Sequence, residues 1–138
     1  MDISRLTEQH REIEEIVQDI LQLAKPAAPT LEAGGKARAR LVDLSGKVGV
    51  HLITEDKVLY PSLLAAKDPA VVAATKRFVD EMGGIAEAFK QYLRDWPTGA
   101  TIHSQSEKFR SDTEKLFSAL AGRIRREESE LYKLAEKT

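Results

Sequence analysis

The chain has 138 residues, of which 42% are hydrophobic, and this length and composition predict one domain, residues 1–138, with its own core. Its 21 basic and 22 acidic residues leave a formal net charge of -1, which indicates neither a nucleic-acid binder nor a membrane-surface binder. The absence of cysteine excludes disulfides, thiolate metal sites and thiol nucleophiles, and no apolar run has the length of a signal peptide or a membrane span. We therefore expect a cytoplasmic protein.

The first predicted helix carries one apolar stripe with a single polar interruption. It begins near Asp2 or Ser4, either of which can cap it, and stops before Pro26. The stripe recurs every three or four positions and consists of Leu6, His10, Ile13, Val17, Ile20 and Ala24. His10 thus lies on an otherwise apolar face. The segment PAAPTLEAGG, residues 26–35, is predicted to be the first connection.

The second predicted helix extends from this connection to about Ala66 and has two titratable residues on its core-facing stripe. The stripe consists of Leu41, Leu44, Val48, His51, Glu55, Val58 and Ser62. Burying an imidazole and a carboxylate one turn apart is costly unless they are paired, hydrogen-bonded or bound to a metal. Gly46 and Gly49 lower the helix propensity of this segment, so we expect a neighbouring helix to approach closely there.

Two further helices are indicated by their start and stop signals. Asp68 followed by Pro69 starts the third helix, and Pro97 ends it. Ser104 and Glu107 form a capping-box pattern for the fourth. The third stripe has no ligand-type residue and consists of Val71, Ala74, Phe78, Met82, Ile85, Phe89, Tyr92 and Trp96. The fourth consists of Phe109, Thr113, Leu116, Leu120, Arg123, Glu127, Glu130 and Leu134.

One internal repeat relates the second helix to the fourth. EDKVLY, residues 55–60, aligns without a gap on EESELY, residues 127–132, and this alignment places Arg123 in the position of His51. Two similar helical hairpins predict an all-α fold, an antiparallel up-down-up-down four-helix bundle. We expect Tyr60 and Tyr132, which end the repeated segments, to pack at the end of the bundle with their hydroxyls in water.

The polar residues on the four stripes are predicted to meet. In an antiparallel hairpin, two residues that are equally far from the connection lie at the same height. His10 and His51 satisfy this condition for the first connection, and Glu55 and Met82 satisfy it for the second. One layer of the bundle is therefore expected to contain His10, His51, Glu55, Arg123 and Glu127, with Met82 facing them from the third helix.

This pattern resembles the hemerythrin-like, or HHE cation-binding, family of four-helix bundles, and the resemblance covers nearly the whole chain. In that family a non-haem di-iron centre takes a His from the first helix, His-x-x-x-Glu from the second, one or two His from the third, and a His followed by Glu or Asp from the fourth. The resemblance implies that the metal-site residues are His10, His51, Glu55 and Glu127. It also implies a degenerate site, because Met82 and Arg123 stand where the family has histidines.

The charges of the layer limit how many metal ions it can hold. Glu55, Glu127 and Arg123 reach neutrality with one protonated His, whereas two divalent ions would leave a large positive excess. We therefore predict a site that is metal-free or holds at most one non-haem iron or other divalent metal. Arg123 is predicted to replace the second metal by donating to Glu55 and Glu127, and the alternative is that its guanidinium extends into water.

The resemblance implies binding or sensing of iron, oxygen or nitric oxide, so the expected partners are a metal ion and a diatomic gas. No nucleic acid, membrane or protein partner is indicated, and we assign no catalytic residue and no enzymatic activity. The alternative function is a metal-independent helical interaction or regulatory module that kept the bundle and lost the metal.

Overall fold

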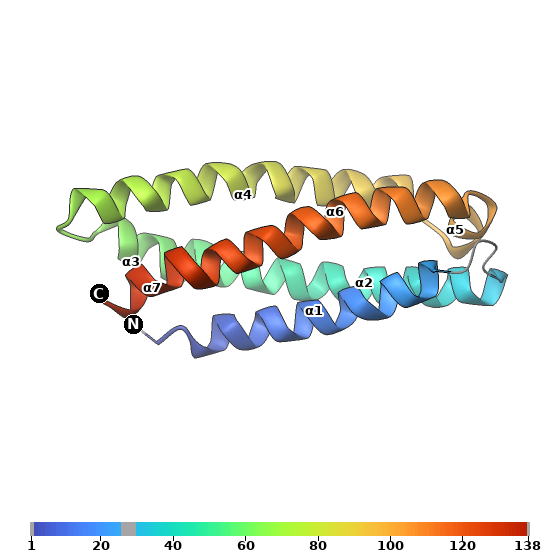
Figure 1. The fold of residues 1–138 in the computed structure, drawn as a ribbon, viewed down its shortest axis with the longest axis horizontal. Coiled ribbons are helices and arrows are strands. Elements are labelled where there is room, and N and C mark those ends of the chain that lie inside the picture. The colour runs from blue at the N-terminus through green and yellow to red at the C-terminus, as the bar shows by residue number, and fades with distance from the viewer. Residues whose placement is uncertain (1, 26–29, 138) are drawn as a thin grey trace.

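Helices form the whole framework of the molecule. The computed structural model describes residues 2–25 and 30–137, apart from the side chain of Met82, and these residues include no strand. The long helices are α1 (Ser4–Ala24), α2 (Leu31–Thr54), α4 (Pro69–Asp95) and α6 (Ser106–Arg126). Figure 1 shows them lying alongside one another along the long axis of the molecule.

Shorter helices extend or connect the long ones. α2 continues into a π-helix, η1 (Glu55–Leu59), and then into α3 (Tyr60–Leu64). α6 continues in the same way into η2 (Glu127–Leu131) and α7 (Tyr132–Glu136). One further helix, α5 (Gly99–Ser104), stands between α4 and α6. The start of α1 and α7 therefore lie at the same end of the molecule (Figure 1).

The predicted start of α4 is confirmed, whereas two other predicted boundaries are wrong. The Asp68 side chain accepts a hydrogen bond from the backbone N–H of Ala70, and Pro69 occupies the first turn. α2 begins at Leu31 and not after residue 35, because Thr30 caps it; residues 26–29 lie outside the described part of the chain. The capping box at Ser104 does not form either.

Another threonine explains why that capping box is absent. The Thr98 side chain caps α5 by accepting a hydrogen bond from the backbone N–H of Thr101. Ser104 then belongs to the last turn of α5, where its hydroxyl donates to the carbonyl oxygen of Thr101. The chain therefore forms a separate short helix before α6, which begins at Ser106 without a side-chain cap.

Close backbone packing occurs at the start of α2 and not at its centre. A Cβ atom added to Gly46 or Gly49 would meet nothing within 4 Å, so the predicted close approach at these residues is wrong. A Cβ atom added to Gly34 would lie 2.5 Å from the carbonyl oxygen of Gly99. The backbones of α2 and α5 thus pack directly against each other, which only glycine permits.

The two π-helices shift the core-facing stripes of their helices. Val58 and Glu130, predicted to face the core, are exposed, and the buried residues are Leu59 and Leu131. A π-turn contains one residue more than the 3.6-residue period assumes, so every later position rotates. The shift is identical in both helices. Each buried position in the first segment has a buried counterpart 72 positions later. The first set consists of His51, Glu55, Leu59, Tyr60 and Leu63, and the second of Arg123, Glu127, Leu131, Tyr132 and Ala135.

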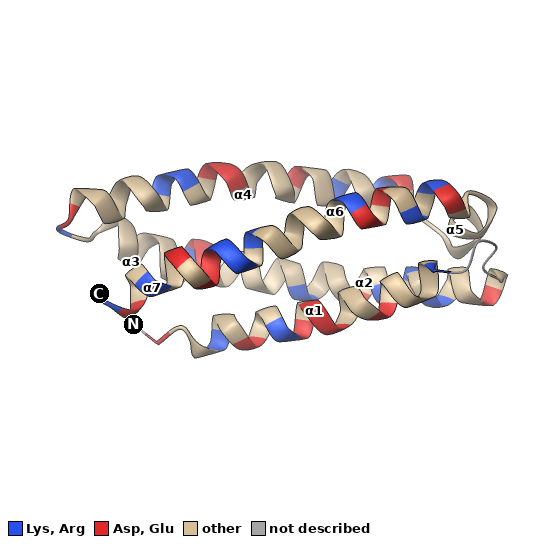
Figure 2. Ribbon diagram, viewed as in Figure 1, with Lys and Arg blue, Asp and Glu red and all other residues tan. Residues whose placement is uncertain are grey.

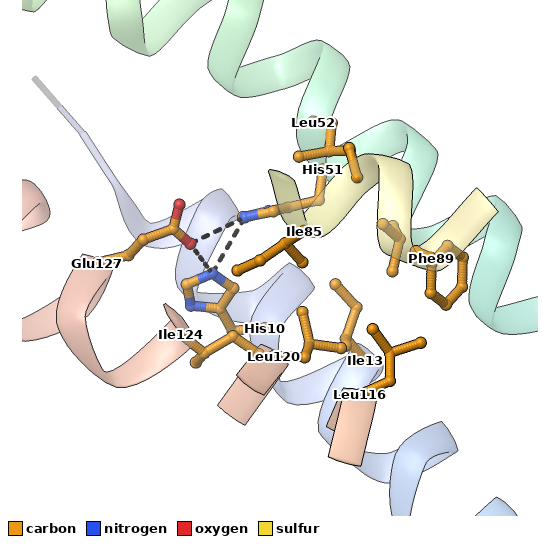
Figure 3. A pocket seen from close by; sticks show the side chains of 12 residues that line it. His10, Ile13, His51, Leu52, Ile85, Phe89, Leu116, Leu120, Ile124 and Glu127 are labelled. Carbon is orange, nitrogen blue, oxygen red and sulfur yellow. Dashed lines mark hydrogen bonds and ion pairs between the residues drawn. The ribbon is translucent and has the colours of Figure 1, made fainter. Parts of the chain in front are cut away.

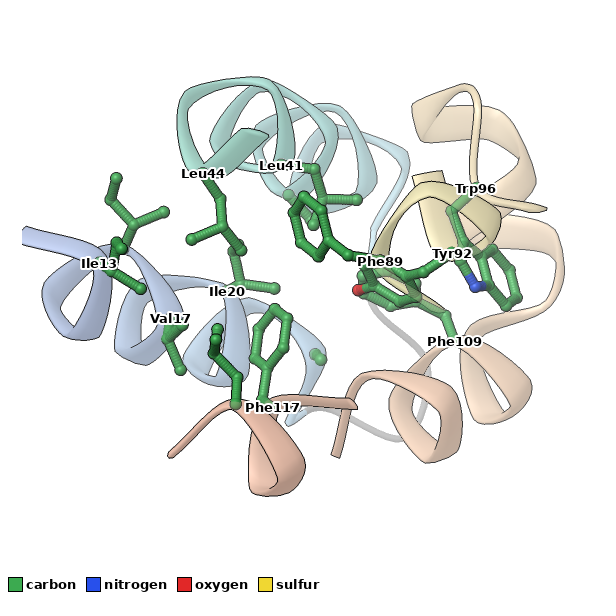
Figure 4. Packing of buried hydrophobic residues seen from close by; sticks show 14 of the residues in the cluster. Ile13, Val17, Ile20, Leu41, Leu44, Phe89, Tyr92, Trp96, Phe109 and Phe117 are labelled. Atoms are coloured by element: carbon green, nitrogen blue, oxygen red, sulfur yellow. The ribbon is translucent and has the colours of Figure 1, made fainter. Parts of the chain in front are cut away.

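Two apolar clusters fill the interior. The larger contains residues of α1, α2, α4, α5 and α6, and Figure 4 shows side chains such as Leu41, Phe89 and Phe117 pointing into a shared interior. The smaller contains Leu6, Leu59, Leu131 and their neighbours. Buried polar residues separate the two clusters along α1 and α2, because His10 follows Leu6 and His51 precedes Leu59 on the same helix faces.

The outer faces of the helices are charged and mixed in sign. Figure 2 shows acidic and basic residues interspersed along the helices, in keeping with the formal net charge of -1. Among the described residues, no helix combines the length and the apolar character that crossing a membrane requires.

Candidate metal centre

The four predicted metal-site residues come together between the two apolar clusters. His10 Nε2, from α1, lies 3.1 Å from Nε2 of His51 in α2 and 2.9 Å from Oε1 of Glu127 in η2 (Figure 3). Oε1 of Glu55, in η1, lies 2.8 Å from His51 Nε2. All four side chains are buried, with at most 4% of each residue exposed.

Each glutamate is positioned by the π-turn that begins at it. The carbonyl oxygen of Glu55 accepts a hydrogen bond from the N–H of Tyr60, and that of Glu127 accepts one from the N–H of Tyr132. These bonds span five residues instead of four, so a glutamate and the tyrosine five residues later lie on the same face. π-turns of this kind occur frequently at functional sites.

The Nδ1 atoms of both imidazoles are hydrogen-bonded to acceptor groups. His10 Nδ1 lies 2.7 Å from Glu128 Oε2, and His51 Nδ1 lies 2.8 Å from Gln9 Oε1. These oxygens can only accept, so each Nδ1 donates and the Nε2 of a neutral imidazole directs a lone pair into the centre. Glu128 is itself held by Arg11. Histidines that bind metals are oriented in this way.

The centre contains more acceptors than donors. Oε1 of Glu55 and Oε2 of Glu127 are buried and make no well-aligned hydrogen bond, although they lie 2.8 Å from His51 Nε2 and 3.7 Å from Arg123 Nε, respectively. The Nε2 atoms of His10 and His51 face the same space. The lone pairs of these atoms repel one another unless protons or a cation lie between them. Two ligand atoms about 2.1 Å from one ion, at right angles, would lie about 3.0 Å apart, which is close to the observed separations.

The set of possible metal-ligand atoms therefore fits a single cation. His10, His51 and Glu127 each offer one ligand atom, and these three atoms lie within 4.8 Å of one another. Glu55 adds a second carboxylate through its contact with His51. All these ligand atoms are imidazole nitrogens or carboxylate oxygens, a combination that suits iron and other first-row divalent metals.

In the absence of a cation, protons occupy this centre. Burial opposes the charged form of His51, but its hydrogen bonds with Glu127 and Glu55 outweigh burial and raise its pKa to about 9. Burial raises the pKa of Glu55 to about 8, and the negative charge of the neighbouring Glu127 also raises it. Burial also favours a higher pKa for Glu127, but its hydrogen bonds with His10 and His51 hold the pKa below the usual value. A cation that binds here must displace protons from His51 and Glu55.

Arg123 turns inward, as predicted, but its hydrogen bonds differ from the prediction. Its guanidinium donates to Glu81 Oε2 at 3.0 Å and to the carbonyl oxygen of Phe78, and it lies 4.3 Å from the centre of the Phe78 ring. Its Nε lies 3.7 Å from Glu127 Oε2. The described contacts of Arg123 do not include Glu55, so the predicted bridge between Glu55 and Glu127 is wrong.

The helix α4 accounts for this difference. Glu81 lies off the apolar stripe of α4, so helical periodicity does not place it near Arg123. Packing nevertheless brings the two side chains together, and Arg126 also pairs with Glu81. Met82, predicted to face the layer from α4, has a side chain outside the described part of the structure.

Two tyrosines also differ from expectation. Tyr132 is only 1% exposed, and its hydroxyl lies 3.1 Å from His10 Nε2 and 3.4 Å from His51 Nε2. The Tyr60 hydroxyl lies 3.4 Å from Glu55 Oε2. The prediction that both hydroxyls are in water is therefore wrong. The repeated Glu-to-Tyr spacing was the available signal, but a regular helical period places these tyrosines on another face.

A small apolar cavity adjoins the centre. His10, His51 and Glu127 line one part of it, and apolar side chains of α1, α2, α4 and α6, among them Ile85 and Phe89, line the rest (Figure 3). Its volume of about 20 Å³ is enough for one molecule of the size of water. The candidate metal centre therefore has an open, non-polar side.

Comparison with known proteins identifies one related family. Residues 1–135 match the model described as the Hemerythrin HHE cation binding domain. The match extends from α1 into α7 and includes every residue of the candidate metal centre. No curated protein and no solved structure matches the chain.

Proposed function

Because the chain belongs to the hemerythrin HHE cation-binding family, we propose that it is a single hemerythrin-like domain that binds one non-haem iron, or another divalent metal, in this centre. The ligands in this proposal are His10, His51, Glu55 and Glu127. The proposal includes an antiparallel up-down-up-down four-helix bundle, formed by α1, α2 with α3, α4, and α6 with α7. The observation that carries it is the convergence of two imidazole Nε2 atoms and two carboxylates in one buried space.

The residues around the centre define what a bound metal could do. Two histidines and one carboxylate, the set His10, His51 and Glu127, leave coordination positions free, as in other non-haem iron sites. When iron is bound, it supplies the capacity to bind a diatomic gas such as oxygen or nitric oxide. The adjoining cavity, of about 20 Å³ and lined mainly by apolar side chains, offers a small ligand a place beside the metal.

The remaining polar residues prepare the centre for the metal. Gln9 and Glu128 fix the tautomers of His51 and His10, so neither imidazole has to turn on binding. Arg11 neutralises the charge of Glu128 at the protein surface. Both imidazoles are thus oriented in advance with Nε2 towards the metal position.

One metal is proposed, and not two, because Arg123 occupies the place of the second. Arg123 corresponds to His51 in the internal repeat, and its permanently charged guanidinium is buried beside Glu127. A second cation at this position would face an adjacent positive charge in a medium of low dielectric constant.

Replacing Arg123 by histidine is expected to raise the iron content of the protein. The wild type should retain about one iron per chain after anaerobic loading with ferrous iron, and the Arg123→His variant should exceed this under identical conditions, because a cation is removed and a ligand is added. Elemental analysis measures both. The Arg126→His variant is the matched control, since Arg126 also pairs with Glu81 but is half exposed, and it should match the wild type.

Three results would contradict parts of this proposal. No gain of iron in Arg123→His would show that Arg123 does not stand in for a metal. Two irons per chain in the wild type would contradict the single-metal centre. A wild-type protein that retains no iron would contradict metal binding itself.

That last result would favour the second candidate function, a metal-independent interaction or regulatory module. The supporting observation is that Arg123 and the protons on His51 and Glu55 can compensate the buried carboxylates without any metal.

A further inference from the structure

We propose that Tyr132 is an additional ligand of the metal, bound through its deprotonated phenol oxygen. This inference rests on the proposed function, because it assigns a ligand within the same centre. The Tyr132 hydroxyl oxygen lies 3.1 Å from His10 Nε2 and 3.4 Å from His51 Nε2. These distances are similar to the 3.1 Å between the two imidazole nitrogens themselves, so the oxygen occupies the position of another ligand atom.

The structure holds Tyr132 firmly in this orientation. Its backbone N–H closes the π-turn that begins at Glu127, so the tyrosine and this carboxylate are positioned by the same local structure. Its ring stacks on the imidazole of His10, with the ring centres 5.3 Å apart and 16° between the planes. Because the residue is 1% exposed, its oxygen has no route to bulk water without unpacking the helix.

The proton of Tyr132 has an acceptor only while the centre holds no metal. In the metal-free protein, the hydroxyl can donate to a lone pair on His10 Nε2, 3.1 Å away. A bound metal would take this lone pair, so the O–H group would lose its acceptor. On metal binding, the O–H bond would break, the oxygen would give an electron pair to the cation, and the proton would leave together with those that the entering cation displaces from His51 and Glu55.

The internal repeat supplies a matched control for this tyrosine. Tyr60 occupies the equivalent position after η1 and is also buried, but its hydroxyl lies near Glu55 Oε2, at 3.4 Å, and the described contacts of Tyr60 include no histidine nitrogen. We therefore expect Tyr132, and not Tyr60, to bind the metal.

Resonance Raman spectroscopy of the ferric protein tests this assignment. Wild-type protein is loaded anaerobically with ferrous iron, its iron content is measured, and the iron is oxidised with ferricyanide, which accepts the electron. A phenolate bound to ferric iron gives a visible charge-transfer band and enhanced phenolate ring vibrations. Since the chain has three tyrosines, the expected result is that the wild type, Tyr60→Phe and Tyr92→Phe all show these signals, and that Tyr132→Phe loses them at equal iron content.

The outcomes separate this inference from the proposed function. Iron-loaded wild type without phenolate vibrations, or Tyr132→Phe that keeps them, would overturn the role of Tyr132 and leave iron binding intact. Wild type without iron would overturn both, and elemental analysis alone would show it. If Tyr132→Phe does not fold or load, the wild type and the other two variants still decide the question by elimination.

Discussion

Replacing Glu127 by glutamine is expected to lower the affinity for ferrous iron by about 100-fold or more. Glu127 Oε1 lies 2.9 Å from His10 Nε2 and 3.5 Å from His51 Nε2, so this carboxylate is the common neighbour of both imidazoles. Glutamine keeps the size of the side chain but removes its negative charge. Loss of a residue that only supports a ligand already costs about 10- to 100-fold in metal affinity, so loss of a ligand should cost at least as much. Anaerobic titration against a competing chelator measures the change.

Glu130 provides the control for this substitution. It lies three residues further along the chain in η2, is exposed, and pairs with Arg126 at 3.5 Å. Glu130→Gln should therefore bind iron like the wild type. Equal affinity of Glu127→Gln and the wild type, with both proteins folded by circular dichroism, would remove Glu127 from the ligand set.

Replacing Gly34 by alanine is expected to destabilise the protein by about 3 kcal/mol, the upper end of the usual range for overpacking. The new Cβ atom would lie 2.5 Å from the carbonyl oxygen of Gly99, and both groups belong to helix backbones. No flexible side chain can move to relieve this contact, so α2 and α5 would have to separate. Urea unfolding of the metal-free protein, followed by circular dichroism, gives the free energy of unfolding.

The matched substitution is Gly46→Ala in the same helix. A Cβ atom at this position meets nothing within 4 Å, and the backbone there is helical. Alanine should therefore stabilise the protein by about 0.5–1 kcal/mol through its higher helix propensity. If both variants were stabilised to the same extent, the close contact between Gly34 and Gly99 would be disproved.

The start of α4 shows what local chemistry can predict. An aspartate that caps a helix and a proline in the first turn act within a few residues of each other, so the signal at Asp68 and Pro69 is independent of the rest of the fold. The start of α2 was harder to predict. Gly34 and Gly35 appeared to belong to a connection because the packing that favours glycine there comes from α5, about 65 residues later, and Thr30, which caps α2, lies inside that predicted connection.

The π-turns account for the most consequential errors. Periodicity places residues correctly on a helix as long as each turn has 3.6 residues, so the positions up to Glu55 and Glu127 are reliable and those beyond them are not. Leu59, Leu131 and Tyr132 rotate into the interior for this reason, and the tyrosine arrives beside the histidines.

Helical periodicity places His10, His51, Glu55 and Glu127 on the inner faces of their helices, because a regular helical period fixes the face on which a side chain lies. The internal repeat likewise shows that a cation, Arg123, stands in the position of His51. Only the three-dimensional arrangement reveals that Arg123 binds Glu81 and Phe78 and that Tyr132 enters the centre. These contacts depend on how neighbouring helices are rotated and on where a π-turn forms, and a regular helical period predicts neither.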